Sequence, residues 1–248
     1  MAQHGRKIPQ ADGVARYVDP SGANPEFPNV NPFFHTHRTF GEQLLPADTA
    51  AQHKGNWPAL FGQDGPLHLE VGAGNGFFLE GLAKQHPNWN IIGLEIRYKR
   101  VVIAAKKLKN SGLTNARVVR YDASFLSDLF EEASLDAVYI NHPDPWPKKR
   151  HEKHRIVSDW FLRVCAPLLR SGGSLRLKTD HRPHIDTLLE LLGPKNNARK
   201  DPLPYTIRQT ADDVTKGESI WEDDVETNFQ KKFRLQGLPV YAVDVVRN

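Results

Sequence analysis

The chain has 248 residues, of which 39% are hydrophobic and 25% are charged, as expected for a globular domain with an extension. A single cysteine, Cys165, excludes an internal disulfide and a zinc site built from several cysteines, and it favours a cytoplasmic protein. With a formal net charge of +4, no apolar run near the ~20 residues that cross a bilayer and no secretory signal, we expect no membrane association.

Residues 1–55 are interrupted by prolines and show no sustained periodicity. We interpret them as an extended N-terminal arm that is partly disordered or laid over the body. Within the arm, NPFFHTHRTF (31–40) combines aromatic and basic residues, which suits either docking or packing. The remaining residues, 56–248, are expected to form one domain.

From residue 66 onward, short apolar runs alternate with segments whose apolar residues recur at helical spacing. The expected strands are 67–72, 91–96, 116–122, 135–141, 174–180, 205–210 and 238–246. The expected helices centre on 78–83, 101–108, 156–168 and 185–192. This alternation predicts a doubly wound α/β domain with a mostly parallel sheet. Because no long helix separates the last two strands, the final one should run antiparallel at or near an edge.

The first expected strand ends in a glycine-rich turn, LEVGAGNG (69–76). Glycines allow a tight turn and let backbone N–H groups approach a ligand closely; they are Gly72, Gly74 and Gly76. A dinucleotide fingerprint requires a third glycine where Phe77 stands, so a pyrophosphate ligand is disfavoured. Glu70, just before the turn, would also repel phosphate and attract a cation.

Acidic residues stand at three consecutive strand ends, Glu70, Glu95 and Asp122. A carboxylate at the end of the second strand suits two ribose hydroxyls. Asp122 can accept a hydrogen bond from an adenine amino group. The three acids and the glycine turn together fit adenosine with a positively charged tail, so we predict S-adenosyl-L-methionine as the cofactor.

The fourth expected strand runs into a proline-rich stretch, NHPDPWP (141–147), followed by a basic run over 148–155. Proline fixes φ, so Asp144 and Trp146 should be pre-positioned beside the ligand. Two roles are open for Trp146, stacking on a base or anchoring the loop. The basic run has five Lys or Arg residues against one acid, Glu152, and suggests an anionic partner, nucleic acid first, although a solvated loop is the commoner explanation of an isolated charge run.

These motifs resemble those of the bacterial tRNA (guanine-N7)-methyltransferases. The resemblance covers roughly residues 66–248 and is carried by LEVGAGNGFF, GLEIRYKRV and above all NHPDPWPKKRHEKHR. It implies a Rossmann-like class I S-adenosylmethionine-dependent methyltransferase fold. It also implies methyl transfer to N7 of guanine 46 in the variable loop of tRNA.

The resemblance implies a role for each matching residue. Asp144 would be the active-site acid and would also lie near the cofactor, together with Glu70, the three glycines, Glu95 and Asp122. The implied substrate-binding residues are Lys148, Asp180, Thr227, Asn228, Phe229 and Gln230. The implied RNA contacts are Lys149, Arg150, His151, Glu152, Lys153, His154 and Arg155.

The sequence departs from the family pattern at three places. Gln230 stands where the late motif has Glu, so one contact loses its charge. His142 replaces the Phe that usually precedes P-D-P-W. Beyond Arg38, the arm lacks further arginines that the family carries.

Two other functions remain open at this stage, a methyltransferase acting on an exocyclic amine and a non-catalytic RNA-binding module. The histidines do not converge with a third ligand, so no metal is expected. The protein is expected to be a monomer or a homodimer.

Overall fold

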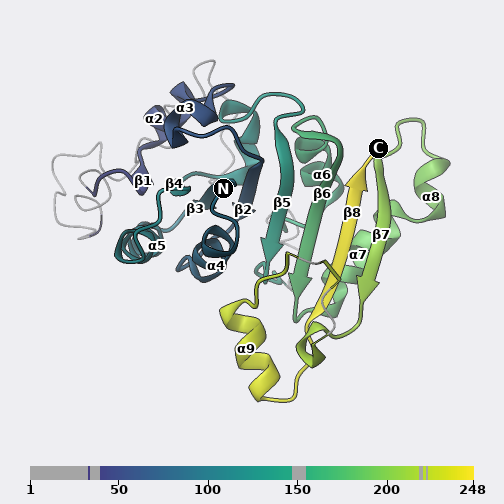
Figure 1. Cartoon of the computed structure of the whole chain (residues 1–248). Helices are drawn as coiled ribbons and strands as arrows, with labels where there is room; N and C mark the ends of the chain where they lie inside the picture. Colours follow the sequence, from purple (N-terminus) through teal and green to yellow (C-terminus); the bar gives the residue numbers. More distant parts are fainter. Residues whose placement is uncertain (1–32, 34–39, 147–154, 218–219, 222) are drawn as a thin grey trace, which may run out of the picture.

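The computed structural model describes residue 33 and residues 40–146, 155–217, 220–221 and 223–248, which form an eight-stranded sheet flanked by helices (Figure 1). In order across the sheet, the strands are β1 (Leu44–Leu45), β4 (Ala116–Arg120), β3 (Asn90–Glu95), β2 (Leu67–Val71), β5 (Leu135–Asn141), β6 (Leu169–Thr179), β8 (Tyr241–Arg247) and β7 (Tyr205–Ala211). Neighbouring strands are parallel except where β8 pairs antiparallel with β6 and β7. The predicted doubly wound sheet is therefore confirmed, with its last strand antiparallel beside the β7 edge.

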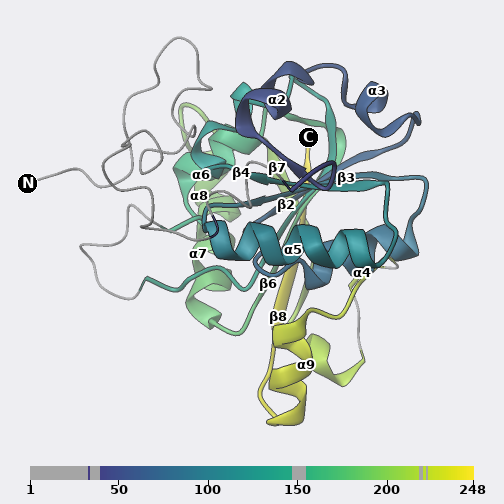
Figure 2. The same ribbon diagram turned by 90° about the vertical axis from the view of Figure 1, so that its left-hand side faces the viewer.

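Helices cover both faces of the sheet (Figure 2). One face packs against α4 (Phe77–Gln85) and α5 (Tyr98–Asn110). The other face packs against α2 (Ala47–Gln52), α3 (Trp57–Phe61), the 3-10 helix η2 (Ala123–Asp128), α6 (Asp159–Cys165) and α7 (Arg182–Leu192). The short elements α8 (Pro194–Asn197) and η4 (Val214–Lys216) complete the body, and α9 (Asn228–Leu235) projects from it (Figure 1).

The body begins earlier than residue 56. Leu44 and Leu45 pair with β4. The helix α2 follows them and buries Ala47 and Ala50. A two-residue strand and a six-residue helix are too short to show periodicity in the sequence. Residues 1–32 and 34–39, the rest of the predicted arm, lie outside the described residues.

The helix expected over 156–168 is shorter than predicted, because α6 spans only Asp159–Cys165. Ser158 starts it as the N-cap, and its side chain accepts a hydrogen bond from the backbone N–H of Phe161. Its buried residues are Phe161, Leu162 and Cys165. Trp160 and Val164, whose spacing predicted the helix, therefore lie on its partly exposed side and not on the side that packs into the core.

Two cations of β6 tie down the segment that leads into α9. Arg176 donates from Nη1 to both carboxylate oxygens of Asp223 at 2.7 Å. Lys178 is fully buried, and its Nζ donates to the carboxylate of Asp224 and to the carbonyl oxygen of Val225. Because a buried ammonium needs a charged partner, these contacts fix the segment 223–225 against β6.

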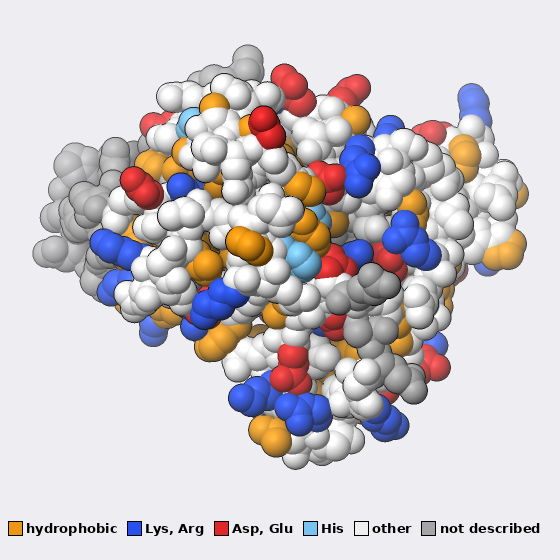
Figure 3. All heavy atoms as spheres, in the orientation of Figure 1, with side chains coloured by type: hydrophobic (Ala, Val, Ile, Leu, Met, Phe, Trp, Pro, Cys, Tyr) orange, Lys and Arg blue, Asp and Glu red, His pale blue; other side chains and the backbone are white. Residues whose placement is uncertain are grey.

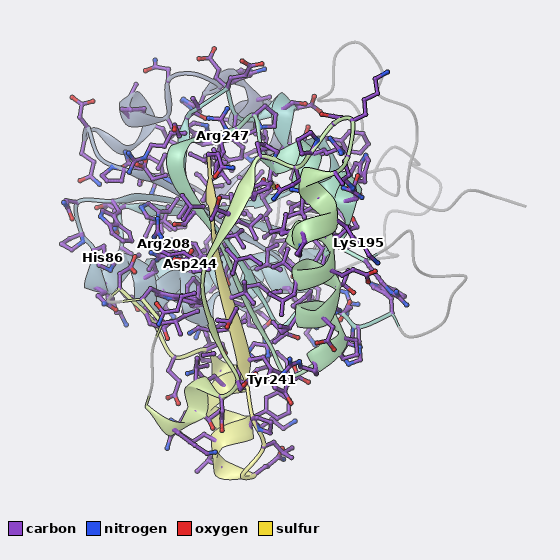
Figure 4. The ribbon with its side chains drawn as sticks, turned by 90° about the vertical axis from the view of Figure 1, so that its right-hand side faces the viewer. His86, Lys195, Arg208, Tyr241, Asp244 and Arg247 are labelled. Carbon is purple, nitrogen blue, oxygen red and sulfur yellow. The ribbon has the colours of Figure 1, made fainter. Side chains whose placement is uncertain are left out.

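A third cation, Arg208, links the last two strands of the sheet. Arg208 of β7 donates to the carboxylate of Asp244 on β8 at 3.2 Å (Figure 4). Burial raises the pKa of Asp244, while Arg176 and Arg208 lower it. The antiparallel edge is therefore closed by charge pairing between strands as well as by backbone hydrogen bonds.

The contact between α4 and α5 depends on Gly76, which precedes α4 with φ 74°. A Cβ atom there would lie 2.8 Å from the Cβ of Ala104 on α5. We predict that Gly76→Ala lowers the free energy of unfolding by about 2–4 kcal/mol, from left-handed strain and from the clash together. Urea denaturation followed by circular dichroism measures this loss.

Gly112→Ala is the matched control, because Gly112 has φ 65° but an added Cβ there meets no atom within 4 Å. It should lose only the strain contribution of roughly 1–2 kcal/mol. Equal losses at the two positions would show that the close approach of the helices is not limiting.

Candidate cofactor and substrate site

A cavity of about 440 Å³ opens at the carboxyl edge of the sheet, where β2, β3, β4 and β5 end. Its volume is in the range of small-molecule sites, and its position is the one expected for a ligand in a doubly wound sheet. The predicted residues that line it are Gly72, Glu95, Asp122, Asp144 and Arg155. Four strand ends and the loop after β5 thus meet at one concave site.

The glycine turn has the backbone geometry that requires glycine. Gly72, Gly74 and Gly76 have φ values of 78°, 56° and 74°. The N–H groups of Gly72 and Ala73 both donate to the carbonyl oxygen of Leu94 at 2.8 Å, which ties the turn to the end of β3. An added Cβ at Gly72 would meet nothing within 4 Å, so this position leaves room above the turn.

Phe77 does not lie between the helix and the sheet, as the sequence argument against a pyrophosphate assumed. Its ring is 45% exposed, and Lys107 Nζ lies 3.7 Å from the ring centroid. The tight helix packing falls on Gly76 instead, because α4 starts one residue later. Glu70 is therefore the remaining residue that disfavours a phosphate ligand at the turn.

Glu70 does not line the cavity; it is buried next to two residues that do, Val71 and Asn141, with only 2% of its surface exposed. Its Oε1 accepts a hydrogen bond from Asn141 Nδ2 at 3.2 Å, whereas the buried Oε2 makes no hydrogen bond of good geometry with a described residue. The pKa of Glu70 is raised to about 7, chiefly by burial and also by the negative charge of Glu95, while hydrogen bonds from Asn141 and from the backbone of Leu79 lower it. A buried carboxylate with so few donors suits a ligand that brings an ammonium group.

Glu95 is held in a fixed orientation at the end of β3. Its Oε1 accepts from the backbone N–H groups of Ile96 and Arg97, both at 2.9 Å. Its Oε2 accepts from the N–H of Gly74 at 3.1 Å and lies 3.9 Å from Nη1 of Arg100. A carboxylate locked this way beside the cavity is pre-organised to accept hydrogen bonds from ligand hydroxyls.

Asp122 occupies the end of β4 and is the N-cap of η2. Its Oδ1 accepts from the backbone N–H of Ser124 at 2.8 Å, and both residues line the cavity. The capping bond fixes the carboxylate at the cavity wall.

The loop after β5 has a strained backbone. His142 and Trp146 both have left-handed φ values, 47° and 40°, which non-glycine residues rarely adopt. Nε and Nη2 of Arg155 both donate to the carbonyl oxygen of Trp146 at 3.2 Å. Between these two residues, Asp144 is exposed and lines the same cavity as Gly72. Arg155, predicted as an RNA contact, thus also supports the loop backbone.

His142 connects the loop to two of the predicted substrate residues. Its Nδ1 lies 3.0 Å from Oδ1 of Asp180, and its Nε2 lies 2.9 Å from Oγ1 of Thr227. The hydrogen bond from His142 lowers the pKa of Asp180. Its ring also lies 5.3 Å, centroid to centroid, from that of Phe229, which is 49% exposed. Sequence comparison marked His142 only as a departure from the family pattern.

Gln230, predicted to bind substrate, is not among the residues that line the cavity. It is buried, forms a capping box with Thr227 and donates from Nε2 to the carbonyl oxygen of Val214. Its Oε1 accepts from Nζ of Lys178 at 3.0 Å. The charge expected from Glu at this position is supplied by Asp224, which neutralises Lys178. Sequence reasoning missed Lys178, although a lysine in the apolar run LRLKT is an unusual buried charge.

The other predicted residues divide into two groups. Asn228 is exposed on the first turn of α9, next to Phe229. The predictions for Lys148, Lys149, Arg150, His151, Glu152, Lys153 and His154 fall outside the described residues. No cluster of three metal-ligating side chains occurs among the residues that the structure describes, and none of the helices there is long and apolar enough to cross a bilayer.

Residues 64–242 match a protein-family model described as "Putative methyltransferase". The chain is 36% identical over 215 residues to the tRNA (guanine-N(7)-)-methyltransferase of Bacillus subtilis strain 168, covering 84% of this chain and 96% of that protein. It is 35% identical to the protein of the same name from Limosilactobacillus reuteri strain DSM 20016, with the same coverage.

Solved structures confirm the fold. TrmN from Thermus thermophilus superposes with a TM-score of 0.52 at 22% identity, covering 88% of this chain and 52% of that one. The 16S rRNA methyltransferase KamB superposes with a TM-score of 0.57 at 17% identity, covering 78% of this chain and 94% of that one. The chain has the Rossmann-like class I methyltransferase fold that uses S-adenosylmethionine, and it belongs to the tRNA (guanine-N(7)-)-methyltransferase family.

Proposed function

We propose that this protein transfers a methyl group from S-adenosyl-L-methionine to N7 of guanine 46 in the variable loop of tRNA. The observation that carries the proposal is the convergence, at one cavity, of Gly72 from the glycine turn with Glu95, Asp122 and Asp144, and the buried carboxylate of Glu70 hydrogen-bonded to the lining residue Asn141. The names of the relatives supply the target atom, and tRNA is the proposed partner.

The cofactor side of the site matches the chemical groups of S-adenosylmethionine. Glu70 Oε2, which makes no hydrogen bond of good geometry with a described residue, would accept from the α-ammonium group. The fixed carboxylate of Glu95 would accept from the ribose hydroxyls, and Asp122 from the adenine amino group. When bound, this cofactor supplies a methyl group on a positively charged sulfur.

The reaction needs alignment and a negative electrostatic field more than it needs a base. Guanine N7 has a lone pair and loses no proton when it attacks, so no general base is assigned. The purine becomes cationic as the methyl arrives, and a nearby carboxylate stabilises that charge. Asp144 is the acid that lines the cavity from the substrate-side loop, so it takes this role.

The substrate side lies between the loop after β5 and the first turn of α9. Asp180 is 41% exposed and would accept from the N1–H and N2–H edge of guanine, which adenine lacks. Phe229 offers a half-exposed ring on which a base can stack, a contact worth roughly 1–3 kcal/mol. The exposed α9 residues Lys231, Lys232 and Arg234 add positive charge near this position (Figure 3).

The same proposal places the protein in the cytoplasm, where tRNA is modified and where the buried thiol of Cys165 stays reduced. A methyltransferase acting on an exocyclic amine would need a group to remove a proton. Nothing among the described residues of the site favours the amine-directed reaction. The methylated nucleoside that the enzyme forms would show which atom is the target.

Incubation with labelled S-adenosylmethionine and unmodified tRNA tests the function. We expect one labelled nucleoside, N7-methylguanosine, and a single borohydride–aniline cleavage at guanine 46. Methyladenosine or methylcytidine in the digest would favour the amine-directed alternative. Cofactor binding without any transfer would leave a non-catalytic RNA-binding module.

Removing the charge of Asp144 should slow the chemical step. We predict that Asp144→Asn lowers the single-turnover rate of methylation at saturating tRNA by about 100-fold, because the cationic purine loses its electrostatic partner. Asp186→Asn, an exposed acid paired with Arg182 on α7, is the control and should keep the full rate. A wild-type rate in Asp144→Asn would remove Asp144 from the mechanism.

The raised pKa of Glu70 makes cofactor binding pH-dependent. An ammonium group near Glu70 favours the ionised carboxylate, so binding of S-adenosylhomocysteine should release a proton from a group whose pKa is about 7 in the free protein. We predict that more proton is released at pH 6.5 than at pH 8, where Glu70 is already largely ionised. Affinity should therefore rise with pH and level off above about pH 7.

Isothermal titration calorimetry in buffers of different ionisation enthalpy measures this release. Glu70→Gln cannot ionise and should bind without releasing the proton. Proton release that persists in Glu70→Gln would assign it to another group.

A further inference from the structure

The backbone of His142 lies in an unfavourable conformation that its contacts must maintain. Its φ of 47° is left-handed, and Pro143 follows it, which restricts the preceding residue further. Its N–H donates to the carbonyl oxygen of Lys178 at 2.8 Å, which extends the pairing of β5 with β6 by one residue. Such residues persist where the surroundings over-determine them, and they cluster at functional sites.

Both ring nitrogens of His142 have partners from other segments. Because a carboxylate only accepts hydrogen bonds, Nδ1 carries the proton that is donated to Asp180. Oγ1 of Thr227 accepts the N–H of Gln230 as the cap of α9, so its hydroxyl proton can be donated to Nε2. The imidazole therefore completes one hydrogen-bond chain from Asp180 to the N-terminus of α9.

Aromatic rings of α9 cover the same imidazole. The centroids of Phe229 and Phe233 lie 5.3 and 5.9 Å from that of His142, and the His142 side chain is only 4% exposed. The helix projects away from the sheet, so the contacts at its first turns hold it in place (Figure 1). Besides His142, the buried Lys178 holds it through Gln230.

We propose that His142 is a positioning residue that holds Asp180 and the first turn of α9 in place for the guanine base. Three segments far apart in the sequence, the loop after β5, the end of β6 and the N-terminus of α9, are joined through one ring. The substrate named here rests on the proposed function, whereas the tether is a property of the free protein. His142 acts through Asp180 and Thr227 and takes no part in the methyl transfer.

Two substitutions separate the hydrogen bonds from the packing. His142→Phe keeps an aromatic ring against Phe229 and Phe233 but removes both hydrogen bonds. His142→Asn places an amide N–H where Nδ1 lies, so it restores the donor to Asp180 and not the link to Thr227. His86→Phe is the control, because His86 also stacks on an aromatic ring, Trp89 at 3.6 Å between centroids, at the opposite end of α4 from the glycine turn (Figure 4).

Steady-state kinetics and hydrogen exchange on the full chain provide the test. For His142→Phe we expect kcat/KM for tRNA to fall about tenfold or more, with KM for S-adenosylmethionine within about twofold of wild type. His142→Asn should recover most of the loss. In the absence of substrate, the amides of α9 should exchange faster in His142→Phe and at the wild-type rate in His86→Phe.

A double-mutant cycle with Asp180→Asn decides whether His142 acts through Asp180. Once the Asp180 carboxylate is gone, adding His142→Phe should change kcat/KM for tRNA by less than about threefold. A full, additive loss in that background, or a wild-type kcat/KM in His142→Phe alone, overturns the positioning role. Unchanged α9 exchange in His142→Phe overturns the tether.

Failure of the proposed function would look different. Wild-type protein would then form no N7-methylguanosine, while the exchange comparison would still decide whether His142 tethers α9.

Discussion

The parallel direction of β2, β3, β4 and β5 is the constraint on which the site depends. Parallel neighbours all end at the same edge of the sheet, so the residues at their ends come together although they are far apart in the sequence. Glu95 and Asp122 reach the cavity in this way, Glu70 is buried next to it, and Asp144 reaches it from the loop after β5. The antiparallel β8 lies outside this group and serves a different purpose, since it brings the chain back after α9.

The proposed substrate side is held together by buried polar contacts rather than by strand direction. Lys178 is inaccessible to solvent and places Asp224 and Gln230, and through them the start of α9. His142 adds a second link to the same helix. Removing one partner of a buried ammonium is strongly destabilising, because it leaves an unpaired charge in the interior. Single apolar substitutions at Lys178 or its partners would therefore disrupt this half of the site.

The meeting of strand ends and acids at one edge of the sheet could be predicted from the sequence, because each strand is a local apolar run with an acid at or just after its end. Both misjudged local features, the length of α6 and the side on which Phe77 lies, depend on where a helix starts. That boundary is set by Ser158 in one case and by Gly76 in the other. The link between His142 and Thr227 spans 85 residues and has no local pattern, so no reading of periodicity could have found it.

The two halves differ in how their acids are satisfied, and this difference suggests an order of events for the proposed reaction. Asp180 already accepts from His142 and Glu95 from three backbone N–H groups, so both are ready before any ligand arrives. Among these acids, Glu70 has a buried oxygen that makes no hydrogen bond of good geometry with a described residue, and its pKa is raised to about 7, chiefly by burial. A cation beside it would favour its ionisation. The ammonium group of the cofactor would therefore pair with the Glu70 carboxylate first. The purine, which becomes cationic during the reaction, would then enter beside Asp144.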